Sequence, residues 1–240
     1  MRDFHRDLAM DLRGKSMQDG RWLIFGYPPN SRFCNYRNHI GGGDERQVEC
    51  VYAGLVMKEF CHRISGWTIH ALECGAATRP DAVKLRKFWE PYRVEWTGID
   101  VNSITEDLYV ERIESAIGKA ELSDFDLVLA ISSLEHSGFL GDTTQAALTS
   151  IRRGLSNNGV LILTLPVGKK FAYRDFNQYG VDECHKMFDD AKLQIVNQRL
   201  WRWNGEYFEN CLEEDVAGTM YGATHNAPRA AGVGAWLLAR

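Results

Sequence analysis

The segment FDLVLAISSLEHSG, residues 125–138, joins an apolar run to a polar turn. A strand with one face in water alternates apolar and polar residues, whereas a parallel strand covered on both faces is apolar almost throughout. The run over residues 125–133 has the second character. We therefore predict a buried strand of a parallel sheet that presents Glu135 and His136 at its carboxyl end.

Strand and helix patterns alternate along most of the chain. Four further strands are predicted, at 67–73, 93–100, 109–114 and 160–166. One helix is predicted to begin at Asp44 and to bury Val48, Val51, Tyr52, Leu55, Val56 and Phe60. A second is predicted from Asp142, with Leu155 as its last inward residue, to the Asn-Asn-Gly turn at 157–159, and a third at 181–191. This order predicts an α/β fold with a doubly wound, Rossmann-like sheet.

Two apolar segments close the pattern, at 195–203 and 232–239. No clear helix lies between them, so we predict that they pair as an antiparallel C-terminal hairpin. The sheet would then have seven strands, most of them parallel. Trp201, Trp203 and Trp236 are interpreted as core residues of the hairpin.

The length of 240 residues suits one large domain with a small appendage. Residues 44–240 carry the alternating pattern. Residues 1–43 are expected to be irregular, with turns at YPPN (27–30) and GGG (41–43), and to form an N-terminal arm or a lid. Aromatic and basic residues of this arm and of a later loop are candidates for an acceptor pocket: Phe33, Tyr36, Arg37, Tyr173 and Arg174.

The composition is that of a soluble globular protein, with 45% hydrophobic and 25% charged residues. The formal net charge of −4 disfavours a nucleic-acid partner, because phosphate backbones are bound by basic surfaces. No apolar window is long enough to span a bilayer, and the first residues carry charges where a signal peptide is apolar. We therefore expect a cytoplasmic protein with no membrane partner. Its oligomeric state is left open.

The six cysteines show no CxxC spacing and are interpreted as reduced. Two Cys-His dipeptides, Cys61-His62 and Cys184-His185, carry side chains of the kinds that bind metals. Neighbouring residues of a helix point in different directions, and no second pair has zinc-site spacing. The simpler interpretation is small core residues beside surface histidines, and no metal site is predicted.

The ends of the predicted strands carry polar residues, and ligands of such sheets bind at the carboxyl ends of the strands. The first strand ends in Glu73, followed by Gly75 and small residues that let a ligand approach the backbone, although a tight turn alone also favours glycine. The second ends in Asp100, which suits the two hydroxyls of a ribose or a helix cap. A carboxylate at Glu73 disfavours a pyrophosphate and favours a positively charged ligand such as S-adenosylmethionine.

These motifs together resemble the class I S-adenosylmethionine-dependent methyltransferases over residues 44–240. The resemblance rests on ALECGAA (71–77), TGID (97–100), FDLVLAISSLEHSG (125–138) and GLSNNGVLILTLPVG (154–168). GGGDERQVE (41–49) and LTLPVG (163–168) are similar to the small-molecule or glycan-modifying members. The chain departs from the family pattern in three places: Glu73 replaces an aspartate, the third glycine of the first motif is missing, and SNNG replaces a Pro-Gly-Gly turn.

The resemblance implies a cofactor site for S-adenosylmethionine. Glu73 and Gly75 would face its methionine part, Asp100 its ribose, and Glu114 with Ser115 its adenine. Ala77 and Ser132 complete the implied cofactor-binding set.

Methyl transfer to a hydroxyl requires removal of a proton, so we predict His136 as the general base and Glu135 as the residue that orients it. Two alternatives stay open. Glu135 and His136 match part of the family's Glu-x-x-Glu-His metal motif, in which Ser132 replaces the first glutamate, and both side chains could instead serve only the loop backbone. The amino-methylating Asp-Pro-Pro-Tyr signature is absent, which favours oxygen or carbon acceptors.

The predicted function is transfer of a methyl group to a small molecule, such as a hydroxyl of a sugar or a specialised metabolite. A non-catalytic module of the same fold, which binds the cofactor or a partner, is the alternative. An NAD-dependent oxidoreductase is disfavoured by the missing glycine and by Glu73.

Overall fold

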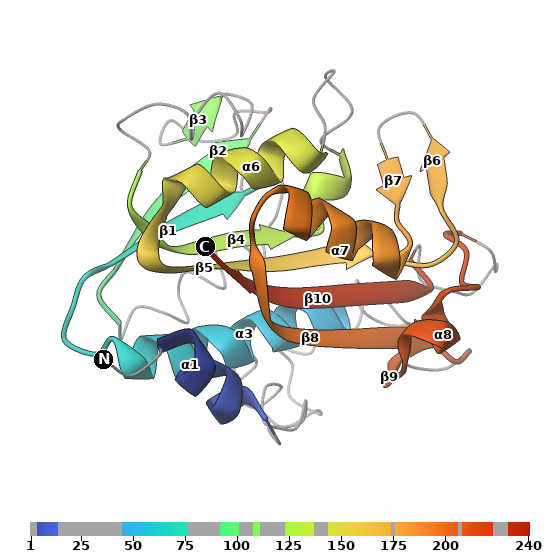
Figure 1. Cartoon of the computed structure of the whole chain (residues 1–240), viewed down its shortest axis with the longest axis horizontal. Helices are drawn as coiled ribbons and strands as arrows, with labels where there is room; N and C mark the ends of the chain where they lie inside the picture. Colours follow the sequence, from blue (N-terminus) through green and yellow to red (C-terminus); the bar gives the residue numbers. More distant parts are fainter. Residues whose placement is uncertain are drawn as a thin grey trace, which may run out of the picture.

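The strands β1 to β5 pair in parallel and form one side of an eight-stranded sheet of order β3-β2-β1-β4-β5-β10-β8-β9 (Figure 1). Their bounds are β1 Ile69–Cys74, β2 Val94–Asp100, β3 Leu108–Val110, β4 Phe125–Ile131 and β5 Leu155–Pro166. The computed structural model describes residues 4–13, 45–75, 92–100, 108–110, 123–136, 144–173, 176–205, 208–222 and 230–240. Four of the five predicted parallel strands are confirmed, and the one predicted at 109–114 is described only as far as Val110, within β3.

Antiparallel strands complete the sheet: β8 Gln194–Trp203, β9 Phe208–Asn210 and β10 Gly232–Ala239. β10 lies between β5 and β8 and pairs antiparallel with both. This confirms the predicted pairing of 195–203 with 232–239. The seven predicted strands thus belong to one mostly parallel sheet, as expected, and β9 is an eighth. The short edge strand β9 was not predicted, and neither was a separate hairpin of β6 Phe171–Tyr173 and β7 Phe176–Gln178.

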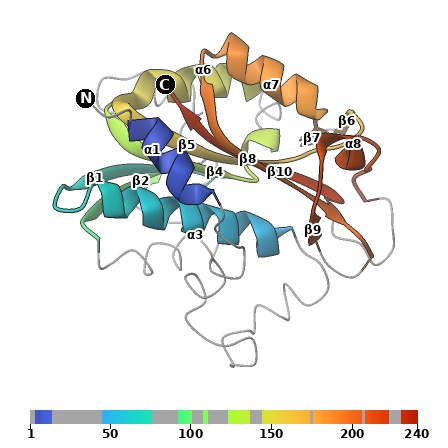
Figure 2. The ribbon, with the colours of Figure 1, turned by 60° about the horizontal axis from the view of Figure 1, so that its bottom comes forward.

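Helices cover the two faces of the sheet. α6 (Thr144–Gly154) and α7 (Val181–Asp190) lie on one face, and α3 (Arg46–Arg63) lies on the other with α1 (Phe4–Leu12) beside it (Figures 1 and 2). Two short helices, η3 (Leu134–His136) and α8 (Glu213–Val216), follow β4 and β9. The six apolar residues predicted on the buried side of α3 are all buried, which confirms that stripe.

β4 is buried on both faces, as its apolar sequence predicted. Leu127, Leu129 and Ile131 belong to the core cluster that contains α1 and α3. Val128 and Ala130 alternate with them and belong to the cluster that contains α6 and α7. The sheet therefore separates two cores, and β4 contributes to both.

The predicted end of the second helix was wrong. α6 ends at Gly154, and Leu155 is already in β5, where it pairs with Phe125. The register between β4 and β5 then shifts, so that Leu127 pairs with Val160. A Cβ at Gly159 would lie 2.6 Å from the Phe125 carbonyl oxygen, so the Asn-Asn-Gly turn is tucked against the start of β4 and does not cap the helix.

Part of the N-terminal arm also differs from the prediction, because residues 4–12 are helical and not irregular. Leu8 and Leu12 of α1 are buried against α3. Arg63, at the end of α3, pairs with Asp11 at 2.5 Å and with Asp7 at 3.7 Å. The apolar contacts and the ion pairs together attach α1 to the domain. Residues 14–44 lie outside the described part of the chain, so the role of this segment as an arm or lid stays a prediction.

None of the described cysteines forms a disulfide: they are Cys50, Cys61, Cys74, Cys184 and Cys211. The first four are buried, and burial raises the pKa of Cys61 to about 12. Such thiols are protonated and unreactive at neutral pH. None of the helices in the described part of the chain is both long and apolar enough to cross a bilayer.

Replacement of Leu129 by alanine tests the two-sided burial of β4. Leu129 is 1% exposed, and its truncation would leave a cavity in the core on the α3 side of the sheet. We expect the free energy of unfolding to fall by about 2–5 kcal/mol, measured by urea denaturation. The matched control is Leu212→Ala, at a leucine that is 65% exposed, where a change within about 0.5 kcal/mol is expected. Equal losses at both leucines would contradict the burial argument.

Candidate functional site

The topological switch point of the sheet lies between β1 and β4, because β2 and β3 continue on one side of β1 while β4 and β5 continue on the other. Glu73, near the carboxyl end of β1, pairs with Gly98 of β2 and Leu129 of β4. Glu73 is buried, with 8% of its surface exposed. Open α/β sheets bind ligands at such a point, so the structure brings Glu73 to the place where a ligand is expected.

Gly75 lets the ends of β1 and β4 approach closely. Its N–H donates to the Ile99 carbonyl oxygen at 2.8 Å, and its φ is +79°, a left-handed conformation that side chains disfavour. A Cβ at this position would lie 2.8 Å from the Cβ of Ser133. Both the backbone and the neighbouring strand end therefore require glycine here.

Ser132 turns the chain sharply out of β4, with a φ of +41°. Its N–H donates to Thr164 Oγ1 at 2.9 Å, and its hydroxyl donates to Glu49 Oε1 of α3 at 2.5 Å. Both Ser132 and Glu49 are buried. The hydroxyl of Ser132 is thus bonded to a carboxylate of the protein itself. This hydrogen bond joins the end of β4 to α3.

Glu49 was missed at the sequence level, although a signal for it exists. Residues at positions i, i+3, i+4 and i+7 share one face of a helix, and from Glu49 these are Tyr52, Ala53 and Val56. All three are buried. An acidic residue on an otherwise apolar helical stripe indicates a buried polar contact, and here that contact is the end of β4.

Glu135 and His136 lie on η3, directly after Ser132 and Ser133. Glu135 is buried, with a side chain that is 4% exposed, whereas the His136 side chain is 49% exposed. His136 Nε2 lies 3.8 Å from Glu135 Oε1. The pair therefore places a solvent-accessible imidazole beside a buried carboxylate.

Two side chains from later elements hold the backbone of η3. Thr144 Oγ1 donates to the Leu134 carbonyl oxygen at 2.8 Å. Because that hydroxyl proton is used, the 2.7 Å bond between Thr144 Oγ1 and Tyr179 Oη has Tyr179 as its donor. Asn177 Nδ2 of β7 donates to the Glu135 carbonyl oxygen at 3.1 Å. η3 is thus fixed by α6 and by the segment that follows β6.

An aromatic side chain, Phe176, contacts His136 and is itself backed by Tyr221. The ring of His136 meets that of Phe176 of β7 edge to face, with the centroids 5.7 Å apart. Phe176 in turn packs on Tyr221, with centroids 3.9 Å apart. None of these neighbours was predicted, because they come from segments more than 35 residues further along the chain. They place an apolar wall beside the imidazole.

The structure leaves several predicted site residues undescribed. Ala77, Glu114 and Ser115 lie outside the described residues, as do Phe33, Tyr36, Arg37 and Arg174. Asp100 is placed at the carboxyl end of β2, and Tyr173 in β6, by their backbones only. The structure does bring together Glu73, Gly75, Ser132, Glu135 and His136 at the switch point.

The alternative of a metal bound by Glu135 and His136 stays a hypothesis. Ser132 stands where the metal motif has its first glutamate, and its hydroxyl is donated to Glu49. A hydroxyl held in this way does not replace a carboxylate ligand. Any metal at this place would depend on Glu135, His136 and ligands from elsewhere.

Solved structures of methyltransferases share this architecture. The 1,6-didemethyltoxoflavin-N1-methyltransferase of Burkholderia thailandensis, solved with 1,6-didemethyltoxoflavin and S-adenosylhomocysteine, is 14% identical, with a TM-score of 0.50 over 74% of this chain and 73% of its own. The CMeT domain of the citrinin polyketide synthase is 17% identical, with a TM-score of 0.53 over 92% of this chain and 59% of its own.

A third structure, the CurJ carbon methyltransferase, is 14% identical, with a TM-score of 0.53 over 95% of this chain and 62% of its own. The chain has the class I methyltransferase fold. No protein-family model matches it, and no curated protein matches its sequence. At these identities the likeness establishes the fold, and the chemistry has to be argued from the residues of this chain.

Alanine substitutions at Gly75 and Gly66 form a matched pair that tests the close approach of β1 and β4. Both glycines have a positive φ, +79° and +98°, but nothing lies within 4 Å of a Cβ at Gly66. Each variant should lose about 1–2 kcal/mol to the left-handed backbone. Gly75→Ala should lose about 1–3 kcal/mol more, because its methyl group overlaps Ser133. Equal losses in urea denaturation would refute the close packing.

Replacement of Tyr179 by phenylalanine tests the hydrogen bond to Thr144. Burial raises the pKa of Tyr179 from 10.0 to about 12, so the neutral phenol is favoured in the folded state. Its contribution to stability is complete below pH 10 and is lost as the pH rises towards 12, because the unfolded phenol ionises first. We expect the variant to be about 0.5–1.5 kcal/mol less stable at pH 8.

The difference between the parent and Tyr179→Phe should shrink in denaturation curves recorded at increasing pH above 10. The comparison isolates this phenol from the buried cysteines and from Tyr52, which ionise in both proteins. A difference that stays constant to pH 12 would show that the phenol is not protected by burial.

Proposed function

We propose that the chain is an S-adenosylmethionine-dependent methyltransferase that acts on a small-molecule acceptor. The observation that carries this proposal is the grouping of Glu73, Gly75, Glu135 and His136 at the switch point of a sheet with this fold. Carboxylates end both β1 and β2, and a carboxylate–imidazole pair follows β4. The proposal assigns the first two to cofactor binding and the last to the reaction.

The residues at the ends of β1 and β2 suit this cofactor better than a dinucleotide. The buried carboxylate of Glu73 is matched to the ammonium group of the cofactor and is poorly matched to a pyrophosphate. Asp100, at the end of the neighbouring strand, is proposed to accept hydrogen bonds from the ribose hydroxyls. Gly75 keeps the backbone open between them. Ala77, Glu114 and Ser115 stay proposed contacts, whereas Ser132 is proposed to act by shaping the strand end.

His136 is proposed to take the proton of an acceptor hydroxyl. The bound cofactor supplies an electrophilic methyl group on its sulfonium. The exposed imidazole accepts the proton, and Glu135, buried and 3.8 Å from Nε2, stabilises the ring once it is positively charged. The hydrogen bonds from Thr144 and Asn177 to the backbone of η3 keep this pair in place. The apolar ring of Phe176 excludes water from one side of the imidazole.

A small organic acceptor is supported by the wall of Phe176 and Tyr221 beside His136. Among the similar structures, one was solved with 1,6-didemethyltoxoflavin and another is a domain of a polyketide synthase. We propose a hydroxyl of a sugar or a specialised metabolite as the acceptor. The alternative is a non-catalytic module that binds the same cofactor, and turnover distinguishes the two.

Calorimetric titration with S-adenosylmethionine, S-adenosylhomocysteine and NAD tests the cofactor. We expect binding of the first two and none of NAD. Asp100→Ala and Glu73→Gln should each weaken that binding by at least about tenfold, the loss expected when a hydrogen bond to a charged group is removed. The matched control is Glu95→Gln, at an exposed carboxylate near the amino end of β2, which should bind as the parent does.

His136→Gln tests the catalytic assignment separately. It should keep the affinity for S-adenosylmethionine and lower turnover by about 10²–10⁴-fold, measured as S-adenosylhomocysteine released with a panel of hydroxylated acceptors. Cofactor binding without turnover on any acceptor would favour the non-catalytic module. Absence of cofactor binding would refute the methyltransferase proposal as a whole.

A further inference from the structure

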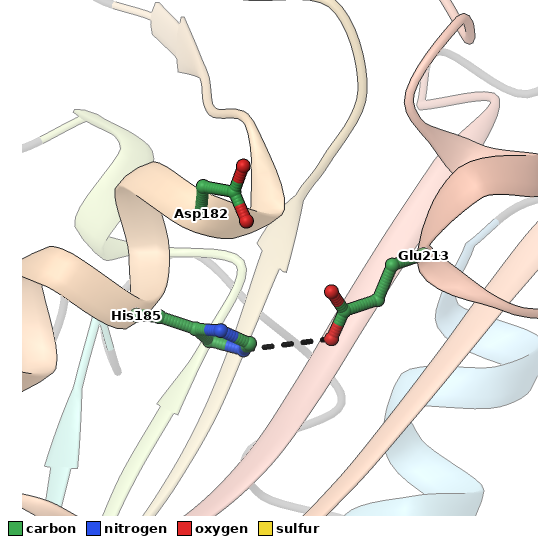
Figure 3. Close-up of side chains that lie close together, drawn as sticks. All are labelled: Asp182, His185 and Glu213. Atoms are coloured by element: carbon green, nitrogen blue, oxygen red, sulfur yellow. Dashed lines mark ion pairs between the residues drawn. The ribbon is translucent and has the colours of Figure 1, made fainter.

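Three side chains with metal-ligating groups converge away from the switch point, on the side of the sheet that carries α7. Asp182 and His185 come from α7, and Glu213 comes from α8 (Figure 3). One ring nitrogen of His185 and one oxygen of each carboxylate all lie within 4.8 Å of one another. His185 Nε2 and Glu213 Oε1 lie 3.9 Å apart.

The local structure explains the convergence. Positions i and i+3 share one face of a helix, so Asp182 and His185 project together from the first turns of α7. Cys184, next to His185, points the other way into the core, where it is fully buried. Glu213 begins α8, which contacts β8, the strand that supplies Gln198 to this cluster. The dipeptide Cys184-His185 therefore contributes only its histidine to the surface.

Gln198, on β8, forms hydrogen bonds with both His185 and Glu213. Its Oε1 accepts a hydrogen bond from Trp236 Nε1 at 2.7 Å and lies 2.6 Å from His185 Nε2. Its Nε2 donates to Glu213 Oε1 at 2.8 Å. Because the indole only donates, Gln198 Oε1 is an acceptor, and His185 Nε2 carries a proton in the metal-free protein. A ligating carboxylate typically has an outer partner that fixes its orientation, and Gln198 Nε2 fills that role for Glu213.

The charges around the cluster favour a cation. Two carboxylates approach one imidazole, and Glu214 and Asp215 follow directly on α8. Lys170 bonds Glu183, and Lys186 bonds Asp190, so these two lysines are paired with carboxylates outside the cluster. Arg202 pairs with Glu209 and lies 3.9 Å from Asp215. Lys170, Lys186 and Arg202 therefore pair with carboxylates other than those of Asp182 and Glu213.

We propose that Asp182, His185 and Glu213 form a binding site for one divalent transition-metal ion of the zinc class. Such an ion forms bonds of about 2.0–2.2 Å to nitrogen and oxygen. One ion can therefore bind both His185 Nε2 and Glu213 Oε1, which are 3.9 Å apart. The exposed side chain of Asp182 supplies the third ligand by rotation, and water completes the shell. An imidazole ligand selects zinc-like ions over calcium and magnesium, which take oxygen ligands.

Binding of the ion through His185 Nε2 would release the Nε2 proton to water and break the 2.6 Å hydrogen bond from Nε2 to Gln198 Oε1, so the imidazole would turn from Gln198 towards the ion. Trp236 keeps its bond to Gln198, and Gln198 continues to hold Glu213. The ion would join α7 to α8. These two elements flank the segments that carry Phe176 and Tyr221, so the site would fix the surroundings of His136 without contacting them. The inference does not depend on the proposed methyltransferase activity.

The test is a titration of the chelator-treated full chain with Zn²⁺, followed by calorimetry and thermal unfolding. One Zn²⁺ should bind per chain, and a Zn²⁺ concentration 100 times the dissociation constant should favour the folded state by about 100-fold. Asp182→Asn, Glu213→Gln and His185→Gln should each weaken binding by at least about tenfold. A 100-fold excess of Mg²⁺ or Ca²⁺ should not displace the ion.

Two controls distinguish this ligand set from its neighbours. Glu214→Gln changes an exposed carboxylate that is adjacent on α8, and Cys211→Ser removes the half-buried thiol two residues before Glu213. Both should bind Zn²⁺ as the parent does. Binding that survives Asp182→Asn and Glu213→Gln, or that is lost with Cys211→Ser, would overturn the proposed site. The two carboxylate variants decide the question even where His185→Gln disturbs folding, because they alter exposed side chains.

Discussion

The burial of β4 on both faces is the constraint on which the rest of the structure depends. A strand without a polar face has to be covered twice, and α3 with α1 covers one side while α6 and α7 cover the other. The chain must therefore cross from one face to the other between parallel strands, which sets the alternation of helices and strands. The residues that follow such a strand lie between the apolar core and the surface. The polar groups of the site are found there, at the carboxyl end of β4.

The exit from β4 shows how buried polar groups are satisfied at this strand end. Ser132 adopts a left-handed backbone, and Thr164 and Glu49 bond its N–H and hydroxyl. Two residues later, Leu134 and Glu135 offer carbonyl oxygens that Thr144 and Asn177 bond. A buried polar group without a partner costs about 1–3 kcal/mol, so these contacts stabilise the one conformation in which Glu135 is buried and His136 is exposed. The geometry of the proposed catalytic pair is thus a result of the hydrogen bonding around it.

The periodicity and length of apolar segments correctly predicted the elements whose burial depends on their own sequence. The apolar run of β4, the buried stripe of α3 and the pairing of 195–203 with 232–239 follow from periodicity and length, and all three are confirmed. The end of α6 was misplaced because the burial of Leu155 beside Phe125 overrides the turn preference of Asn-Asn-Gly. Tyr179, Asn177 and Phe176 were missed because they reach η3 only through tertiary folding. The same holds for Glu213, which only tertiary folding brings to Asp182 and His185.

The position of β10 has a consequence for the order in which the sheet is assembled. Residues 232–239 lie between β5 and β8, so the strand made last of the three is the middle one (Figure 1). On the ribosome, β1 to β5 can associate while β8 and β9 still have no edge to join, because β5 and β8 do not pair with each other. The antiparallel strands then join the sheet late, when β10 pairs with β5 and β8. Pairing of strands that are far apart in the sequence is slow and tends to limit the folding rate. Until that step, the edge of β5 stays open to other strands in the crowded cell.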